Sequence, residues 1–220
     1  MPLQTIIPRL SAFSGEAGLQ EIVIPASVVE VGRNLWNETG GGGAFQNCTA
    51  LTSVVFEGDN LSKINLNTFN GCSALSSIEL PESLEKIEYN AFDDCSALNS
   101  IVIPDKVTYI GDGVTEIAAK AFAECTALKT VVIGKSIQRI GDQAFNTRSS
   151  WDQMTLEKIT VLFDDIASGS FPVLESGSRG VFPKPGGWDL VSYKIYVPKG
   201  TKAEYQKNWS DYSSLIVEMQ

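Results

Sequence analysis

Residues 91–104 read Ala-Phe-Asp-Asp-Cys-Ser-Ala-Leu-Asn-Ser-Ile-Val-Ile-Pro, and variants of this stretch recur along the 220-residue chain. A leucine lies six residues after each of the first five recurring phenylalanines, and a pair of apolar residues spaced by two follows it. A fixed period of this length is the signature of stacked repeats. The basic unit has 23 or 24 residues, because the phenylalanines are 32, 24, 23, 30 and 23 residues apart, at Phe13, Phe45, Phe69, Phe92, Phe122 and Phe145.

The spacing within one unit predicts its local structure. In residues 101–103 the two isoleucines are expected to point inward and the residue between them outward, which is typical of a short strand. Pro104 ends this strand. A second apolar pair, such as Val107 and Ile110, indicates a turn or short strand on another face. The three-residue spacing from Phe to Leu is interpreted as a turn of helix. Since no unit covers its own apolar side, we expect an α+β, right-handed solenoid of about seven units with a parallel sheet.

The repeats also predict the domain organisation. We expect a single domain over 1–220, with regular repeats in 10–165, insertions at 33–43 and 112–119, and an irregular unit in 166–191. Residues 192–220 then form the last strand and a C-terminal cap. Tyr205, Trp209 and Tyr212 are spaced four and three apart, which predicts one face of a helical turn that covers the last unit.

Composition and charge exclude several classes of function. The net charge of −9 argues against a surface for nucleic acid or anionic membranes. The chain has no histidine, which removes the usual Ser-His-Asp and Cys-His catalytic sets and the commonest zinc ligand. No stretch approaches the ~20 apolar residues of a membrane span, and the first residues lack the pattern of a signal peptide. We therefore expect no enzyme, no cofactor, no metal site and no membrane insertion.

The pattern Ala-Phe-x-x-Cys-x-x-Leu-x-x-Ile-x-Ile-Pro, followed by Ser-Leu-x-x-Ile, resembles the BspA-like leucine-rich repeats. The tail from Lys194 to Ile216 resembles the closing segment of such proteins in gut and oral Bacteroidetes. The resemblance implies a curved leucine-rich repeat solenoid that is secreted or displayed at the cell surface, its leader absent from this chain. It also implies membership of a family known for adhesion to host proteins. The units after Phe145 are irregular, and no clear N-terminal cap precedes Phe13.

Four cysteines occupy one position of the repeat, three residues after a phenylalanine: Cys48, Cys72, Cys95 and Cys125. Equivalent positions of stacked units lie about one strand spacing apart, beyond the ~3.8 Å that separates disulfide Cβ atoms. We therefore interpret these cysteines as a buried column of free thiols with a structural role, like that of Trp209. Carboxylate pairs such as Asp93 and Asp94 are interpreted as solvated surface.

Candidate ligand-binding residues fall into two groups. The first comprises outward positions of the predicted strands, which form a mildly apolar face: Val23, Val55, Glu79, Val102, Val132 and Tyr196. Strand preference alone is the alternative explanation for these residues. The second group comprises Trp36, Trp151 and Trp188 in the inserted segments, where tryptophan serves as an interface anchor or a sugar-stacking platform. Each of them alternatively folds back to pin its own loop.

These observations lead to a non-catalytic, extracellular or cell-surface binding module. It would recognise host or neighbouring-cell macromolecules, proteins first, through the sheet face and the tryptophan-bearing insertions. Two alternatives stay open, namely a glycan-binding surface protein and an architectural spacer of a longer surface protein without a ligand of its own. The identity of the ligand, the face that binds it and the oligomeric state are left open by the sequence.

Overall fold

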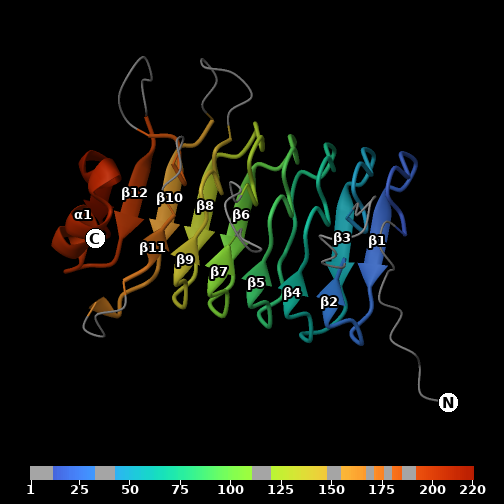
Figure 1. Ribbon diagram of the computed structural model, residues 1–220, viewed down its shortest axis with the longest axis horizontal. Helices are drawn as coiled ribbons and strands as arrows, with labels where there is room; N and C mark the ends of the chain where they lie inside the picture. The colour runs from blue at the N-terminus through green and yellow to red at the C-terminus, as the bar shows by residue number, and fades with distance from the viewer. Residues whose placement is uncertain are drawn as a thin grey trace.

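The computed structural model describes residues 12–32, 43–110, 120–147, 155–166, 171–175, 180–184 and 192–220. The chain alternates between two sides, each built from parallel strands (Figure 1). We call the first the long-strand side; its strands are β1 (Glu21–Ile24), β3 (Ser53–Phe56), β6 (Ser100–Ile103), β8 (Thr130–Ile133), β10 (Lys158–Val161), β12 (Lys194–Val197) and β13 (Ile216–Glu218). We call the second the short-strand sheet; its strands are β2 (Glu30–Val31), β4 (Lys63–Ile64), β5 (Lys86–Ile87), β7 (Tyr109–Ile110), β9 (Arg139–Ile140) and β11 (Val173–Leu174).

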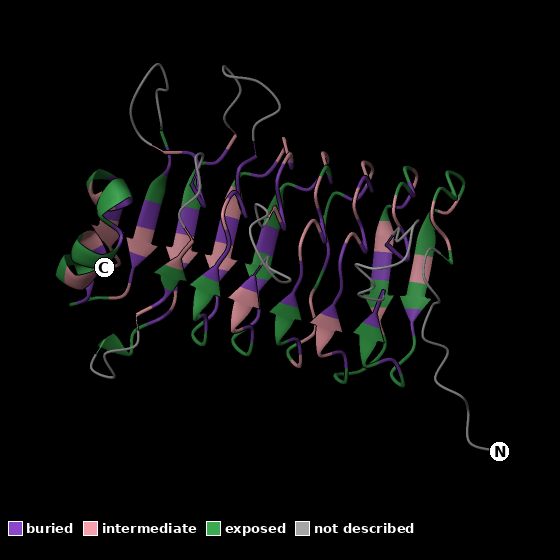
Figure 2. Ribbon diagram, in the orientation of Figure 1, coloured by how far each residue is buried: buried purple, intermediate pink, exposed green. Residues whose placement is uncertain are grey.

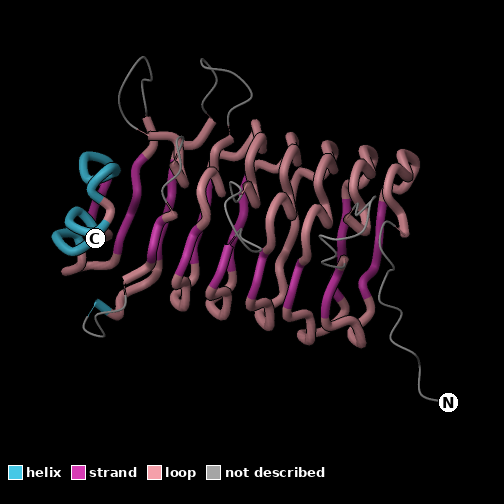
Figure 3. The backbone as a smooth tube through the Cα atoms, viewed as in Figure 1, coloured by secondary structure: helices cyan, strands magenta, loops and turns pink. Residues whose placement is uncertain are grey.

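The two sides differ in continuity. The short-strand sheet is one sheet with the order β11-β9-β7-β5-β4-β2, whereas the long-strand side consists of a pair, β1-β3, and a five-stranded sheet, β13-β12-β10-β8-β6. Residues 77–80 hold the third predicted strand but form none, and Figure 3 draws them as loop. The expectation of a single parallel sheet along this side is therefore wrong at the third unit. The second apolar pair of each unit does form a short strand on another face, as the spacing predicted.

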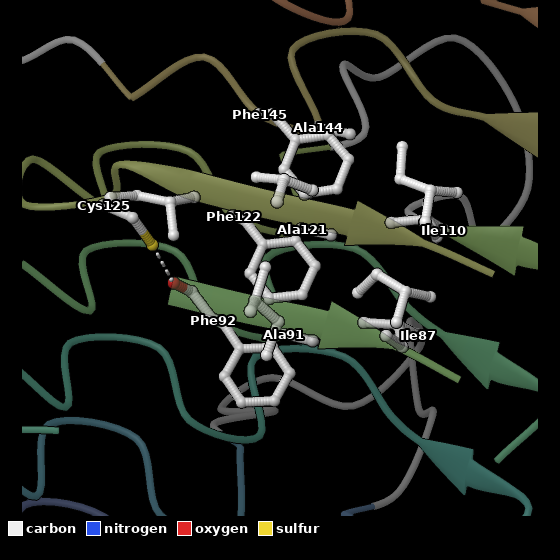
Figure 4. Close-up of a cluster of buried hydrophobic side chains, with 14 of the residues drawn as sticks. Ile87, Ala91, Phe92, Ile110, Ala121, Phe122, Cys125, Ala144 and Phe145 are labelled. Atoms are coloured by element: carbon white, nitrogen blue, oxygen red, sulfur yellow. Dashed lines mark hydrogen bonds between the residues drawn. The ribbon is translucent and has the colours of Figure 1, made fainter. Parts of the chain in front are cut away.

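A column of phenylalanine rings runs through the core. Successive rings stack with centroids 5.0–5.6 Å apart, and the column comprises Phe13, Phe45, Phe69, Phe92, Phe122, Phe145 and Phe182. Phe182 continues the column into the irregular unit, where the sequence pattern is no longer regular. Figure 4 shows Phe92, Phe122 and Phe145 in this stack, beside the buried Ala91, Ala121 and Ala144. Because every ring contacts an identical ring of the next unit, the repeat fixes its own stacking distance.

The run from Phe to Leu forms turns rather than helix. The amide of Cys95 donates to the carbonyl of Phe92 at 3.2 Å, and the amide of Leu98 donates to that of Cys95 at 2.9 Å. Asp94 lies between them with φ +57°, in the left-handed region, which a right-handed helix does not continue through. Three-residue apolar spacing fits both a turn and a helix. The expected helical character is therefore wrong for the repeats that the structure describes.

The chain ends in a helical cap at the far end of the strand rows from β1 (Figure 1). It comprises α1 (Lys202–Asn208), the 3-10 helix Ser210–Leu215 and β13, which pairs in parallel with β12. Trp209 separates the two helices with φ −111° and ψ 53°, so the three cap aromatics do not share one helix face. All three are nevertheless buried. None of the helices among the described residues is long and apolar enough to cross a membrane.

Hydrogen bonds from the cap aromatics reach carbonyls of the last regular repeat and of the irregular unit. The Tyr205 hydroxyl donates to the Phe163 carbonyl at 2.8 Å, and the Tyr212 hydroxyl donates to the Phe182 carbonyl at 3.0 Å. The indole Nε1–H of Trp209 donates to the Pro172 carbonyl at 3.0 Å. The cap thus covers the last unit and satisfies backbone groups that lie in its buried interior.

Candidate binding surface

Outward side chains of the long-strand side form a row in register. Val23 pairs with Val55, Val102 with Val132, Val132 with Thr160, and Thr160 with Tyr196. Side chains in register point to the same face of a sheet, while the residues between them point inward. We call this row the outer row: Val23, Val55, Val102, Val132, Thr160 and Tyr196.

Three valines of the outer row are strongly exposed. The exposed fraction is 60% for Val102, 50% for Val23 and 49% for Val55. The strand neighbours of Val102, Ile101 and Ile103, are buried. Figure 2 shows such changes between buried and exposed residues along the strands. A β-branched residue favours a strand wherever it points, but a row of such residues in solvent leaves apolar area uncovered.

The short-strand sheet presents a different chemistry. Its outward positions, also in register, are Glu30, Lys63, Lys86, Tyr109, Arg139 and Val173. Several of these side chains already have partners, since Lys63 pairs with Glu88 at 2.9 Å and the Arg139 guanidinium lies 5.4 Å from the Tyr109 ring. Arg139 also pairs with Glu175. Among the residues that the structure describes, the long-strand side is therefore the one with a row of exposed valines.

The outer row changes character toward the C-terminus. Val132 and Tyr196 are half-buried. The Lys158 ammonium lies 4.9 Å from the centre of the Tyr196 ring, in a cation–π arrangement, and Lys158 is in register with Lys194. Tyr196 is thus partly covered by a cation of the neighbouring unit. The exposed apolar part of the row lies on β1, β3 and β6.

The remaining predicted ligand-binding residues lie elsewhere. Trp36, Trp151 and Trp188 fall outside the described residues. Glu79 is exposed, but it belongs to residues 77–80, which are not a strand, and it lines a groove beside β3. The sequence analysis did not single out this groove. A signal was present, because four residues separate Phe56 from Leu61 where three separate the matching residues of other units.

The cysteines form a ladder of buried free thiols. Each Sγ–H donates to a phenylalanine carbonyl of the preceding unit, over 3.0 Å for Cys48 and 3.2 Å for Cys72, Cys95 and Cys125. Figure 4 shows the bond from Cys125 to Phe92. Burial raises the pKa of the Cys72 thiol to about 12 and raises the pKa of the other three. The thiols are therefore protonated and act as donors to turn carbonyls, since the nucleophile and metal ligand is the thiolate.

One carboxyl departs from the expected solvated surface. Asp93 is half-buried, and burial raises its pKa to about 6. The Lys120 ammonium opposes this shift, while Glu124 and Asp94 add to it. The described residues hold no group of three or more His, Cys, Asp or Glu side chains placed to bind a metal ion.

These features define a leucine-rich repeat protein with a parallel strand in each unit and a closing cap. Six copies of the BspA type leucine rich repeat region match the chain, over residues 38–114 and 109–172. The chain belongs to this family, and as a member it is a non-catalytic repeat protein. No curated protein sequence matches the chain.

Solved structures share the fold. The pneumococcal vaccine antigen PcpA superposes with a TM-score of 0.63 at 20% identity, over 91% of this chain and 42% of that one. A leucine-rich repeat protein of Bacteroides ovatus gives a TM-score of 0.57 at 25% identity, over 86% and 42%. The leucine-rich repeat protein of T. pallidum gives 0.54 at 26% identity, over 74% and 73%. The chain spans 42% of the length of the first two proteins.

Proposed function

We propose that the chain is a binding module displayed outside the cell, which recognises a host or neighbouring-cell protein through the outer row and the tryptophan-bearing insertions. The observation that carries the proposal is the set of exposed valines on β1, β3 and β6, where Val23 is in register with Val55 and Val102 occupies the equivalent position of its own strand. Membership of the BspA-type family supports display at the cell surface. The charged and already paired short-strand sheet offers no comparable apolar row among its described positions.

We further propose that residues 1–220 form one right-handed solenoid of about seven units. The stack of seven phenylalanine rings supports this count. Parallel strands of one sheet are joined by right-handed connections in about 98% of cases, which supports the hand. A stack of this kind holds its outward residues at a fixed spacing of ~4.8 Å, so a partner meets several contacts without ordering the surface first.

The outer row alone contributes too little for a stable complex. Covering the exposed half of a valine side chain is worth about 1 kcal/mol, so Val23, Val55 and Val102 together supply about 3 kcal/mol. Association opposes this with at least about 4 kcal/mol of lost translational and rotational freedom. The partner must therefore contact further residues, and Trp36, Trp151 and Trp188 are the side chains best suited to anchor it.

Biolayer interferometry against immobilised extracellular-matrix proteins and a panel of glycans tests the proposal. The variant carries Val55→Lys and Val102→Lys, which place charges in the outer row. The matched control carries Val29→Lys and Val173→Lys, because these valines are 48% and 54% exposed and lie beside or in the short-strand sheet. We expect saturable binding to a protein that the outer-row variant loses and the control keeps.

Two other results would overturn the protein-binding proposal. A shift of tryptophan fluorescence with a polysaccharide, together with no binding to any protein, would establish glycan capture. Absence of binding to the whole panel by the folded chain would favour the architectural spacer. A second variant with Trp36, Trp151 and Trp188 changed to alanine separates the insertions from the outer row. If that variant binds like the parent, the insertions are not part of the interface.

A further inference from the structure

Two lysines lie side by side on the outer face of the long-strand side. Lys158 belongs to β10 and is in register with Lys194 of the adjacent β12, and both side chains are exposed (Figure 1). We call these two residues the lysine pair. Each lies two residues before a member of the outer row on its own strand, namely Thr160 and Tyr196, so the four side chains point to the same face. The lysine pair therefore belongs to the candidate binding surface.

No carboxylate of the described residues neutralises the lysine pair. Neither of its ammonium groups forms a salt bridge within the part of the chain that the structure describes. The carboxylate of Glu157, which is adjacent in sequence, pairs instead with Lys129 at 3.3 Å. The Glu218 carboxylate of the neighbouring β13 accepts a hydrogen bond from the Gly200 amide. Two adjacent cations thus remain uncompensated in a chain whose net charge is −9.

Another pair of lysines in register shows how such a repulsion is relieved inside the chain. Lys63 of β4 is in register with Lys86 of β5 in the short-strand sheet. There the Glu88 carboxylate lies 2.9 Å from the Lys63 ammonium. Like charges directly opposite each other on neighbouring strands destabilise a sheet, and an adjacent carboxylate removes that repulsion. The lysine pair has no such carboxylate among the described residues, so its repulsion remains until an anion from outside is bound.

The ring of Tyr196 positions one of the two ammonium groups. The Lys158 ammonium lies 4.9 Å from the centre of this ring, which belongs to the neighbouring strand β12. A cation–π contact restrains an ammonium group and leaves N–H donors free for other acceptors. Because Lys194 is carried by β12 as well, the ring draws Lys158 toward the strand of its partner. The two cations are thus brought to one place before a ligand binds.

The arrangement favours a carboxylate of a protein over a stacked sugar. Two ammonium groups from strands ~4.8 Å apart match the two oxygens of one carboxylate. Sugar stacking requires an open aromatic face, whereas the Tyr196 ring is half-buried and the Lys158 ammonium lies over it. Val132 and Thr160 continue the outer row from Tyr196 toward the exposed valines. A partner that covers this face therefore meets apolar side chains at one end and cations at the other.

We propose that the lysine pair binds a carboxylate of the protein partner. The partner surface then has acidic side chains where it meets β10 and β12, and apolar side chains where it meets β1, β3 and β6. Since the cations lie at one end of this surface, they fix the direction in which the partner lies along the stack. This inference rests on the proposed function, whose partner chemistry it specifies.

Amide chemical shifts of the ¹⁵N-labelled chain, titrated with a peptide of alternating glutamate and valine, test the inference. We expect saturable shifts at residues 158–160 and 194–196, which weaken at high salt because exposed charge contacts are screened. The Lys158→Gln, Lys194→Gln double variant should bind the peptide about fivefold more weakly, since two such contacts are lost.

A matched control removes the same charge elsewhere. Lys86 on β5 and Lys106 in the turn after β6 are exposed, and the double variant Lys86→Gln, Lys106→Gln should bind the peptide like the parent. Lys194→Gln alone should not lower the urea midpoint, because it removes a repulsion. A lower midpoint would show that Lys194 stabilises the stack, and it would overturn the proposal.

Other ligands separate a protein carboxylate from its alternatives. Equal binding of a lysine–valine peptide, or lack of saturable shifts at the lysine pair, would overturn the proposal. So would tighter binding of a hyaluronate oligosaccharide, which would assign the site to acidic glycans. Shifts at these residues that depend on the concentration of the chain without peptide would assign it to a second copy. If the Lys158→Gln, Lys194→Gln variant keeps full binding in the protein panel while Val55→Lys, Val102→Lys loses it, the proposed function stands and the lysine-pair proposal falls.

Discussion

Trp209 closes the last unit, and its replacement by alanine tests how the cap stabilises the stack. The side chain is 2% exposed, and its ring packs edge-on against Tyr205 and Phe171 with centroids 4.9 and 6.2 Å away. Burying an aromatic side chain of this size removes about 200 Å² from water, or about 5 kcal/mol. Because the unfolded chain already buries part of that area, about 3–4 kcal/mol remains. The lost hydrogen bond to the Pro172 carbonyl adds about 1 kcal/mol.

We therefore expect Trp209→Ala to lower the free energy of unfolding by about 4 kcal/mol, measured by urea denaturation followed by circular dichroism. The control Trp209→Phe keeps most of the buried area, loses the indole donor and should lower it by about 1–2 kcal/mol. Hydrogen exchange should show that β12 and β13 lose protection before β6 and β8, because the cap contacts the end of the stack. An unchanged urea midpoint for Trp209→Ala, or equal loss of protection in every strand, would refute this reasoning.

Three further predictions concern the core and its charges. Phe122→Ala should lower the free energy of unfolding by about 4 kcal/mol, because Phe122 is buried between two rings. Phe13→Ala should lower it by only about 1 kcal/mol, because Phe13 is half-exposed at the end of the column. Comparable urea midpoints for the two variants would contradict this. A thiol reagent at pH 8 should label no cysteine of the native chain and all four in urea, and rapid native labelling of any would contradict their burial. Burial raises the pKa of Asp93 to about 6, so the stability that this carboxyl contributes is complete below about pH 4 and is lost as the pH rises through 6. Asp93→Asn cannot ionise, so this variant keeps its stability at pH 7 and should be more stable than the parent by about 1 kcal/mol, allowing for solvent screening. If the difference between the two free energies of unfolding in urea does not grow from pH 4 to pH 7, the prediction is contradicted.

The spacing in the sequence predicts the contacts that equivalent residues of adjacent, similar units make with each other. The phenylalanine column and the short-strand sheet follow from it, since Phe92 meets Phe122 as Phe69 meets Phe92. The apolar pattern of residues 77–80 does not predict the interruption, because that unit carries the same pattern as the others, although the turn of the preceding unit has one more residue. Residues 77–80 pair neither with β3 nor with β6, although the units on both sides form strands at the equivalent positions. A pattern within one unit specifies which residues face inward, whereas pairing depends on the fit between two units.

The same distinction explains the candidate surface. Exposure of Val23, Val55 and Val102 follows from alternation along each strand, but the partial covering of Tyr196 depends on Lys158 of the adjacent unit. Aligning outward positions places Lys158 opposite Lys194 and Tyr196 opposite Thr160, so the contact between Lys158 and Tyr196 is a diagonal one. The turn in place of a helix depends on the left-handed Asp94, which apolar periodicity does not report.

The interruption affects one side of the stack and leaves the rest continuous. Closing it would require the backbone of residues 77–80 to pair with β3 on one side and with β6 on the other. The ring column and the β4–β5 pairing already fix the spacing of these two units on the other faces. The interruption at residues 77–80 is therefore a local loss of backbone pairing between units that keep their stacking distance, and it is not a gap between those units.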